Sequence, residues 1–271
     1  MDRIQVVDGI EIQNLPEKER LVETVRRCRG PRGSNVSLSV KSKDGKTRSV
    51  NVVRDQIELV NVSGAGTRED GKVTFRLEED TRIGYSLVHS FSQQTARHFR
   101  DAIDVLESGD DLIGLVIDLR GNGGGLMTTS LEIADLFLSD GDLLMVHGRR
   151  GNKTYSADSD EVLKAVPLVV LVNSETASAA EILAGALKDR GRASIAGERT
   201  FGKGSVQALF NLSGGGAIRL TTARFYLPSG VSLERLPETD QDDWGVSPND
   251  SLSVEVSEEQ RDAVAERIAR F

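Results

Sequence analysis

The sequence of 271 residues predicts an α/β fold, because short apolar segments and longer amphipathic segments alternate along most of it. The short segments are rich in valine, isoleucine and leucine and are bounded by turn residues, which is typical of strands. The longer segments repeat apolar residues every three or four positions, which is typical of helices. Alternating strands and helices build βαβ units, so we expect a largely parallel sheet covered by helices.

The first 55 residues are expected to form a small β/α unit. Turn signals of the Asp-Gly type follow its first strand and separate its last two, so hairpins are predicted at both places. Asn14 is expected to cap the helix, whose first turn contains Pro16. The stretch 63–72 is polar and glycine-rich, which indicates a domain boundary. The predicted elements are strands at 4–7, 36–40 and 50–53 and a helix at 16–29.

The remainder of the chain carries the alternating pattern and ends in an amphipathic helix. Two neighbouring strands surround three consecutive glycines at 214–216 and are expected to pair in antiparallel fashion. The predicted strands cover 83–88, 112–119, 143–146, 168–172, 193–196, 206–212 and 217–226, and the predicted helices cover 95–106, 126–138, 177–188 and 257–271.

Composition disfavours several classes of protein. The formal net charge is −8, whereas a nucleic-acid partner requires a basic surface. The one cysteine, Cys28, allows no intramolecular disulfide and no cysteine-based zinc site. His89, His98 and His147 lack the spacing of metal ligands, so no metal is expected. The apolar runs are far shorter than the ~18 residues of a membrane span, and the first residues do not resemble a signal peptide.

A glycine-rich turn is expected at 118–126 (DLRGNGGGL), after a buried strand and before a helix. A dinucleotide fingerprint would occupy this place, and Gly121 and Gly123 match its first two glycines, but Leu126 stands at the third. Two alternatives remain open. The segment is either a structural strand-to-helix turn, or a nest of glycine N–H groups that forms half of an oxyanion hole.

A lysine-containing loop at 197–204 (GERTFGKG) nearly matches the phosphate-binding loop of nucleotide-binding proteins. It departs from that motif at Gly204, which replaces the hydroxyl group that would bind magnesium. The residues after Lys203 also predict a strand, whereas the motif requires a helix. Taken alone, the segment is better explained as a loop with an exposed lysine between two glycines.

Small residues surround Ser178 in the segment 173–183, where a strand ends and a helix begins. Ser178 falls near the helix N-terminus, where unpaired N–H groups and the helix dipole favour developing negative charge. The structural alternative is that one of the hydroxyl groups in this segment only caps the helix.

A serine nucleophile requires a general base, and the sequence favours lysine for this role. No serine lies in a G-x-S-x-G elbow and histidines are few, which disfavours a Ser-His-Asp triad. A lysine serves as the base when burial favours its neutral form. If Lys203 begins a strand, Ser205 and Gln207 lie on the same face of that strand. Gln207 would then orient the amine of Lys203, and the flanking glycines would let backbone and substrate approach closely.

Together these segments resemble the C-terminal processing peptidases, also called tail-specific proteases, a family of PDZ-containing Ser-Lys peptidases. The resemblance covers nearly the whole chain, and the order and separation of its motifs make it specific. The matching motifs are DLRxNxGGL at 118–126, TASAAEILAGAL at 176–187, TFGKGSVQ at 200–207, FYLPSG at 225–230 and WGVSP at 244–248.

The resemblance implies a serine endopeptidase that hydrolyses peptide bonds near protein C-termini. The family's nucleophile matches Ser178, its general base matches Lys203 and its glutamine matches Gln207. Its oxyanion donors match the backbone N–H groups of Gly124 and Ala179. No cofactor and no metal are implied.

The resemblance also implies a domain organisation. A crotonase-like (ClpP/crotonase-type) protease core is expected over 59–271, after a PDZ domain over 1–58. The chain begins at a strand that follows the family's carboxylate-binding loop, so we expect this PDZ domain to be N-terminally truncated. The family's further aspartate matches Asp189, for which we expect a structural role. The implied partners are protein or peptide substrates with free C-termini in the periplasm or cell envelope, and no oligomeric state follows.

Two other classes of function compete with proteolysis. A truncated PDZ domain favours a non-catalytic peptide-binding or adaptor protein with a relic active site. A crotonase-type acyl enzyme would share the oxyanion geometry but would not need Lys203. The presence of Ser178, Lys203 and Gln207 together favours the peptidase.

Overall fold

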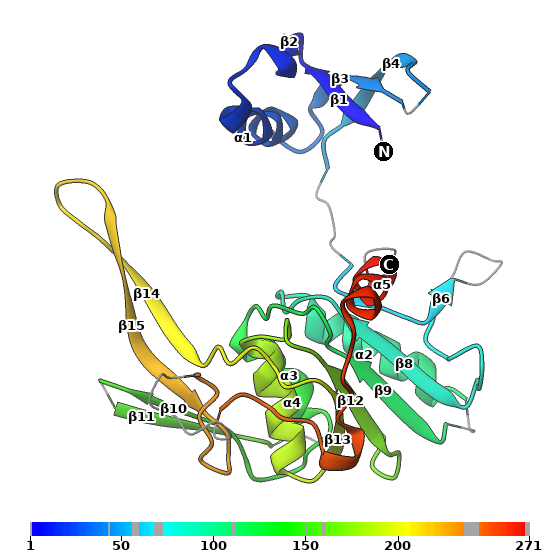
Figure 1. The fold of residues 1–271 in the computed structure, drawn as a ribbon, viewed down its shortest axis with the longest axis vertical. Coiled ribbons are helices and arrows are strands. Elements are labelled where there is room, and N and C mark those ends of the chain that lie inside the picture. Colours follow the sequence, from blue (N-terminus) through cyan, green and yellow to red (C-terminus); the bar gives the residue numbers. More distant parts are fainter. Residues whose placement is uncertain are drawn as a thin grey trace. The chain divides into compact units, whose positions relative to one another are not determined.

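The computed structural model describes residues 2–42, 44–55, 60–67, 73–109, 112–149, 151–158, 161–235 and 244–268. The chain forms two compact units, Met1–Leu59 and Val60–Phe271 (Figure 1). The second unit begins before the polar stretch 63–72, because β5 (Val62–Ser63) is a buried strand of its sheet. The domain boundary that we expected within 63–72 from its polar composition is therefore wrong.

The first unit is an antiparallel sheet accompanied by a single α-helix in its described residues. The sheet has the order β2-β1-β3-β4, and both predicted hairpins are present. Its buried apolar core is small and consists of Val7, Ile12 and Val36. The elements are β1 (Arg3–Val7), β2 (Ile10–Glu11), η1 (Ile12–Asn14), α1 (Glu17–Cys28), β3 (Asn35–Lys41) and β4 (Thr47–Val53).

Asn14 does not cap α1, so that prediction is wrong. The helix begins at Glu17 with Pro16 at the N-cap position. Asn14 instead ends the 3-10 helix η1, and its side-chain amide donates a hydrogen bond of 2.9 Å to Glu11 Oε2. Proline fixes the backbone angle that a helix start requires and has no N–H to satisfy, which explains why the chain enters the helix there.

The second unit is built on a five-stranded sheet with the order β13-β12-β9-β8-β5. Four of its strands are parallel, as the βαβ pattern predicts, and β5 joins the edge in antiparallel fashion. A short hairpin of β6 and β7 lies outside this sheet. The strands not yet given are β6 (Gly66–Thr67), β7 (Val73–Thr74), β8 (Ile83–Val88), β9 (Gly114–Asp118), β12 (Leu168–Val172) and β13 (Ala193–Gly197).

Helices cover this sheet and bury its apolar side chains. The helix α4 is buried along nearly its whole length, from Ala179 to Leu187, which matches its run of alanine, leucine and isoleucine. Among the described residues, no helix combines the length and the apolar character that crossing a membrane requires. The helices are α2 (Thr95–Glu107), α3 (Met127–Asp135), α4 (Ala179–Asp189), η2 (Asp250–Leu252) and α5 (Glu258–Ile268).

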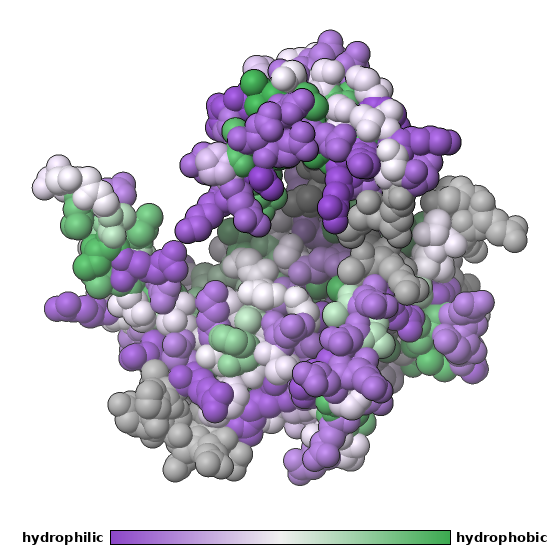
Figure 2. Space-filling model, turned by 45° about the horizontal axis from the view of Figure 1, so that its top comes forward, coloured by the Kyte–Doolittle hydropathy of each residue, from purple (hydrophilic) through white to green (hydrophobic). Residues whose placement is uncertain are grey.

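A second, antiparallel sheet has the order β11-β10-β15-β14 and extends into a long hairpin (Figure 1). The hairpin of β14 and β15 was predicted from the sequence, whereas β11 was not. Figure 2 shows hydrophobic surface along the projecting part of this hairpin, where Leu209, Phe210, Ile218 and Leu220 are exposed. The strands are β10 (Asp142–Gly148), β11 (Gly151–Ser156), β14 (Ser205–Asn211) and β15 (Ala217–Tyr226).

Candidate active site

Three connecting segments meet at the carboxyl edge of the parallel sheet. They are the glycine-rich turn after β9, the serine turn between β12 and α4, and the loop after β13 that contains Lys203. Ala177 N–H donates to the carbonyl of Asn122 (2.9 Å), and Phe201 N–H donates to the carbonyl of Thr176 (2.9 Å). Ligand sites in α/β proteins form at this edge, because the parallel strands all end there.

Ser178 occupies the N-cap position of α4 in an unusual backbone conformation, with φ 58° and ψ −119°. For a residue other than glycine, such a conformation costs about 1–3 kcal/mol and persists only where the surroundings enforce it. Its side chain is half-buried. The next N–H group, that of Ala179, donates to no acceptor among the described residues, as expected in the first turn of a helix. This N–H and the helix dipole favour negative charge beside Ser178.

Glu181 enforces the Ser178 conformation, and it also holds the lysine loop. Its side chain is fully buried, and each oxygen accepts two hydrogen bonds. Oε2 accepts from the backbone N–H groups of Ser178 and Lys203, both at 2.8 Å. Oε1 accepts from the Thr200 hydroxyl (2.6 Å) and the Gly202 N–H (2.8 Å). Because one oxygen contacts both nitrogens, the backbones of Ser178 and Lys203 lie close together.

Glu181 is a residue of the candidate site that our sequence reasoning did not single out. Burial raises the pKa of its carboxyl group, and the four hydrogen bonds that it accepts oppose this rise. The signal that could have found it is the capping-box pattern, in which a serine at the N-cap is followed three residues later by glutamate.

The glycine-rich turn lies directly against the serine. A Cβ atom added to Gly124 would lie 2.8 Å from the Ser178 Cβ and 3.0 Å from the Ala179 nitrogen, so no larger residue fits. The Gly124 N–H, which we expect to be an oxyanion donor, here donates to Asn122 Oδ1 (2.8 Å). Asn122 is buried and also donates from Nδ2 to the Val88 carbonyl at 2.8 Å. Asn122 therefore fixes the conformation of the turn. Its Oδ1 accepts the hydrogen bond of Gly124, which is one of the two N–H groups that we expect to stabilise the oxyanion.

The side chain of Lys203 is exposed, unlike its backbone N–H. Among the described residues, no hydrogen bond joins Lys203 Nζ to Ser178 Oγ, so the structure brings the two backbones together but not these two atoms. Gln207 is also exposed and lies on β14 beside a bulge. The expected convergence of the three side chains thus stays a prediction.

The glycines around Lys203 admit the protein's own side chains and backbone. A Cβ atom on Gly202 would lie 2.6 Å from the Trp244 ring, and one on Gly204 would lie 2.2 Å from the Glu234 nitrogen. The close approach of backbone that we expected at these glycines is therefore present at Gly204, whereas the neighbour of Gly202 is a side chain. The expected approach of the substrate stays a prediction. The two glycines let the loop pack against the segments around Glu234 and Trp244, which fixes the position of Lys203.

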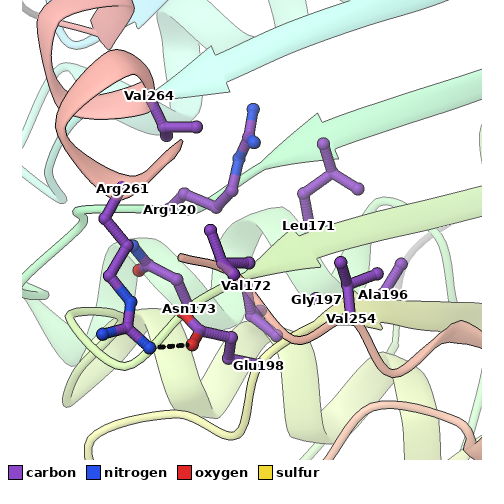
Figure 3. Close-up of a pocket in the computed structure, with 11 residues that line it drawn as sticks. Arg120, Leu171, Val172, Asn173, Ala196, Gly197, Glu198, Val254, Arg261 and Val264 are labelled. Atoms are coloured by element: carbon purple, nitrogen blue, oxygen red, sulfur yellow. Dashed lines mark hydrogen bonds and ion pairs between the residues drawn. The ribbon is translucent and has the colours of Figure 1, made fainter. Parts of the chain in front are cut away.

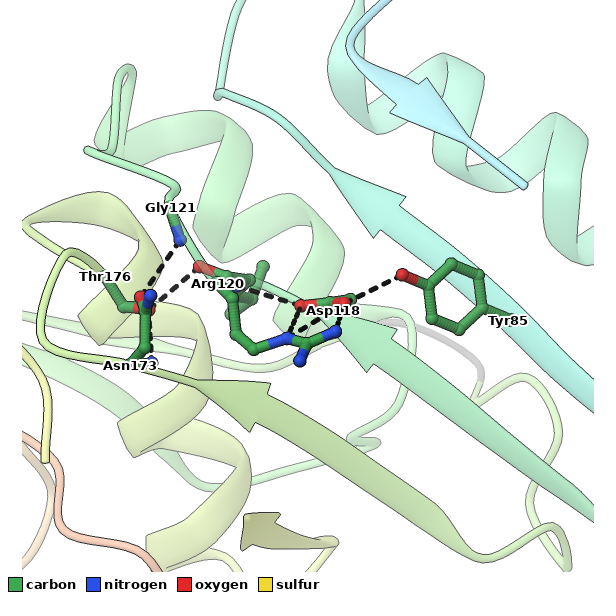
Figure 4. Close-up of polar contacts among 7 residues, drawn as sticks. Tyr85, Asp118, Arg120, Gly121, Asn173 and Thr176 are labelled. Atoms are coloured by element: carbon green, nitrogen blue, oxygen red, sulfur yellow. Dashed lines mark hydrogen bonds and ion pairs between the residues drawn. The ribbon is translucent and has the colours of Figure 1, made fainter. Parts of the chain in front are cut away.

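A buried polar network supports the glycine-rich turn from behind (Figure 4). Asp118 is fully buried and accepts hydrogen bonds from the Tyr85 hydroxyl (2.7 Å) and the Arg120 guanidinium (2.6 Å). Asn173 Oδ1 accepts from the Gly121 N–H at 3.0 Å, which ties the turn to the end of β12. Burial and the Asp118 carboxylate raise the pKa of Tyr85, so the phenol remains a donor. Arg120, which lies within the glycine-rich turn, therefore has a structural role here.

Asp189, expected to be structural, lies at the far end of α4. Its Oδ2 accepts a hydrogen bond of 2.8 Å from the Ser229 N–H. It therefore anchors the segment that carries the FYLPSG motif to this helix.

An apolar cavity of about 160 Å³ lies at the same sheet edge, beneath α5 (Figure 3). Leu171, Val172 and Val264 contribute to its wall, and Glu198 pairs with Arg261 beside it. Neither Ser178 nor Lys203 lines this cavity, so it is distinct from the serine site.

The chain belongs to peptidase family S41, whose model matches residues 82–249 and thus spans both Ser178 and Lys203. This confirms the family that the motifs indicated. The chain is 36% identical over 239 residues to a carboxy-terminal-processing protease of Bartonella bacilliformis, covering 86% of this chain and 51% of that protein. It is 39% identical over 238 residues to a carboxyl-terminal-processing protease of a Picosynechococcus species, covering 87% and 54%.

Among solved structures, a photosystem II D1 C-terminal processing protease matches with a TM-score of 0.58 and 32% identity. That match covers 94% of this chain and 63% of the other. The chain spans about half the length of the two curated relatives described above. The fold is accordingly the mixed α/β fold of an S41 peptidase.

Proposed function

We propose that this protein is a serine endopeptidase of the C-terminal processing type, with Ser178 as nucleophile and Lys203 as general base. One observation carries the proposal. Glu181 Oε2 accepts hydrogen bonds from the backbone N–H groups of Ser178 and Lys203, both at 2.8 Å. A buried carboxylate is costly unless its oxygens are hydrogen-bonded, and here those hydrogen bonds fix the relative position of two residues 25 positions apart.

The chemistry follows from these positions. Ser178 Oγ attacks the scissile carbonyl carbon as its proton passes to the neutral amine of Lys203, and the C–N bond then breaks. The protonated lysine delivers that proton to the leaving amine. Water hydrolyses the acyl-serine in the reverse sense, again with Lys203 as base. The side chain of Lys203 must first turn toward Ser178, a contact that is commonly loose without substrate.

The negative charge on the substrate oxygen is stabilised by two backbone N–H groups. That of Ala179 has no acceptor among the described residues and lies in the first turn of α4. That of Gly124 becomes available when its hydrogen bond to Asn122 Oδ1 opens or is shared. Gln207 orients the amine of Lys203. Donors positioned before the charge develops account for much of the rate enhancement in acyl transfer.

The domain assignments form part of the same proposal. Residues 59–271 are a crotonase-like protease core, and residues 1–58 are the C-terminal portion of a PDZ domain. The substrates are proteins or peptides with free C-termini, encountered in the periplasm or cell envelope. The names of the curated relatives support C-terminal processing as the reaction.

A second candidate is a non-catalytic peptide-binding protein with a relic active site. The exposed side chain of Lys203 and the Asn122 hydrogen bond at Gly124 favour it. The two candidates differ in whether peptide bonds break.

The test is digestion of an unfolded protein by the purified chain, with terminal mapping of the products by mass spectrometry. The peptidase proposal expects cleavage that Ser178→Ala abolishes without loss of folding. Peptide binding without cleavage by the wild-type chain would favour the relic. Thioester hydrolysis retained in Lys203→Ala would instead indicate a crotonase-type acyl enzyme.

A further inference from the structure

An open, basic hollow of about 380 Å³ lies on the antiparallel sheet of the second unit. It is formed where β10 and β15 pair, at the base of the projecting hairpin (Figure 1). Arg149 and Arg224 provide its charge, and His147 and Asn152 contribute further hydrogen-bonding groups. None of the described residues that line it is acidic.

The strand register aligns several of these residues in one row. Asn152 pairs with His147, His147 pairs with Arg224, and Arg224 pairs with Ser205 across the four strands. Residues paired in this way lie on the same face of a sheet. The His147 ring also stacks on Tyr226, with centroids 4.6 Å apart. The lining of the hollow therefore combines a row of paired strand residues with an aromatic pair, His147 and Tyr226.

The two arginines are free to bind a ligand. Both side chains are exposed, and no ion pair joins either of them to a described carboxylate. A guanidinium group presents a fork of N–H donors that matches the two oxygens of a carboxylate.

The hollow lies within reach of the serine site. Arg224 pairs with Ser205, two residues after Lys203, and the Phe225 N–H donates to the Gly204 carbonyl (2.7 Å). Paired Cα atoms lie about 5 Å apart, and two strand residues span about 7 Å. The Cα atom of Arg224 is therefore within about 12 Å of that of Lys203, a span of about three to four extended residues.

We infer that this hollow is a subsite for a carboxylate group of the substrate, held by Arg224 and Arg149 a few residues from the scissile bond. The inference rests on the proposed peptidase function, because it gives that reaction its preference for acidic or terminal segments. The carboxylate is either the C-terminal group of the substrate or the side chain of an aspartate or glutamate. Both present the same two oxygens to the arginines.

The experiment measures binding by fluorescence anisotropy to the full chain carrying Ser178→Ala, so that hydrolysis plays no part. The probe is a short labelled peptide of alanine, leucine and serine in three forms. One is amidated, one has a free C-terminal carboxylate, and one is amidated with a single internal glutamate. The free acid and the glutamate form distinguish the two sources of the carboxylate.

We expect at least one carboxylate form to bind about tenfold more tightly than the amidated neutral form, and high salt to reduce this difference. Arg149→Ala with Arg224→Ala should remove the preference. The control is Arg219→Ala, which removes one charge from an exposed position on β15 outside the hollow and should keep it.

Equal affinity for all three peptides would overturn the inference, and so would an equal loss in the Arg219 variant. The two proposals fail separately. If the serine variant shows the preference but the wild-type chain cleaves nothing, the peptidase function is wrong, whereas the binding of a carboxylate in the hollow stands.

Discussion

Glutamine in place of Glu181 is the most informative single change, because it keeps the shape of the side chain while it removes the carboxylate charge and replaces one acceptor by a donor. The amide replaces one acceptor oxygen by an NH2 donor. Each Glu181 oxygen accepts a backbone N–H: Oε1 from Gly202, and Oε2 from both Ser178 and Lys203. Whichever way it turns, the glutamine amide must therefore face at least one N–H group.

The loss in the free energy of unfolding is worked out for the orientation of the glutamine amide that disrupts fewer hydrogen bonds. With its NH2 toward Gly202 and Thr200, the glutamine leaves one buried N–H unpaired and removes the acceptor of the Thr200 hydroxyl. An unpaired buried donor costs about 1–3 kcal/mol and a lost hydrogen bond about 0.5–1.5 kcal/mol. We expect Glu181→Gln to lower the free energy of unfolding of the second unit by about 2–4 kcal/mol. For a unit of this size, the melting temperature falls by roughly 5–15 °C.

The assay combines thermal unfolding followed by circular dichroism with the rate of peptide hydrolysis. Hydrolysis should fall at least about tenfold at a temperature where the variant is folded, because Thr200 and Gly202 lose their acceptor and the loop that carries Lys203 shifts relative to Ser178. Glu132→Gln is the control, since Glu132 is exposed on α3, and it should change stability by less than about 0.5 kcal/mol. If the Glu181→Gln variant melts at the wild-type temperature and hydrolyses peptide at the wild-type rate, this reasoning is refuted.

Three further outcomes are expected. Lys203→Arg should abolish hydrolysis with normal circular dichroism, because arginine stays protonated; an active variant would exclude this lysine as base. Gly125→Ala should lower the melting temperature far more than Gly123→Ala, because its Cβ would lie 2.1 Å from the Phe91 carbonyl oxygen whereas Gly123 faces open space; equal melting would contradict this. Burial lowers the pKa of His89 from 6.5, so its stabilising contribution is present above that pH and is lost below it. Denaturant titrations of wild type and His89→Gln should therefore diverge in acid, and parallel profiles would count against this.

The order of elements in the second unit could be predicted from the sequence because apolar periodicity reports burial. The run Leu168–Val172 is a central strand, and the alanine- and leucine-rich segment after Ser178 is a buried helix. The strand Gly151–Ser156 was missed because most of its residues are polar and exposed, and only pairing with β10 makes it a strand. A strand that forms mainly because it pairs with a neighbouring strand has few buried apolar residues, so its own sequence does not predict it.

In the candidate site, too, some residues could be identified from the sequence and others could not. Ser178 could be placed from its position between a strand and a helix, and Lys203 from its glycine-flanked loop. Glu181 could not be singled out from periodicity, because a charged residue in a helix is usually solvated, and its burial arises only from three segments meeting. The neighbours of Gly202 and Gly204 could not be named from the sequence, because Trp244 and Glu234 are distant along the chain. Contacts of this kind appear only in the folded chain.

The central claim, that Ser178 is the nucleophile and Lys203 its base, is tested most directly by covalent labelling. The chain is incubated with a fluorophosphonate, digested and mapped by mass spectrometry, with Ser178→Ala and Lys203→Arg treated in parallel over the same time. We predict a single adduct on Ser178 in the wild type, none in Ser178→Ala, and labelling at least about a hundredfold slower in Lys203→Arg. An adduct on another residue, or equal labelling rates in the wild type and the arginine variant, would contradict the account.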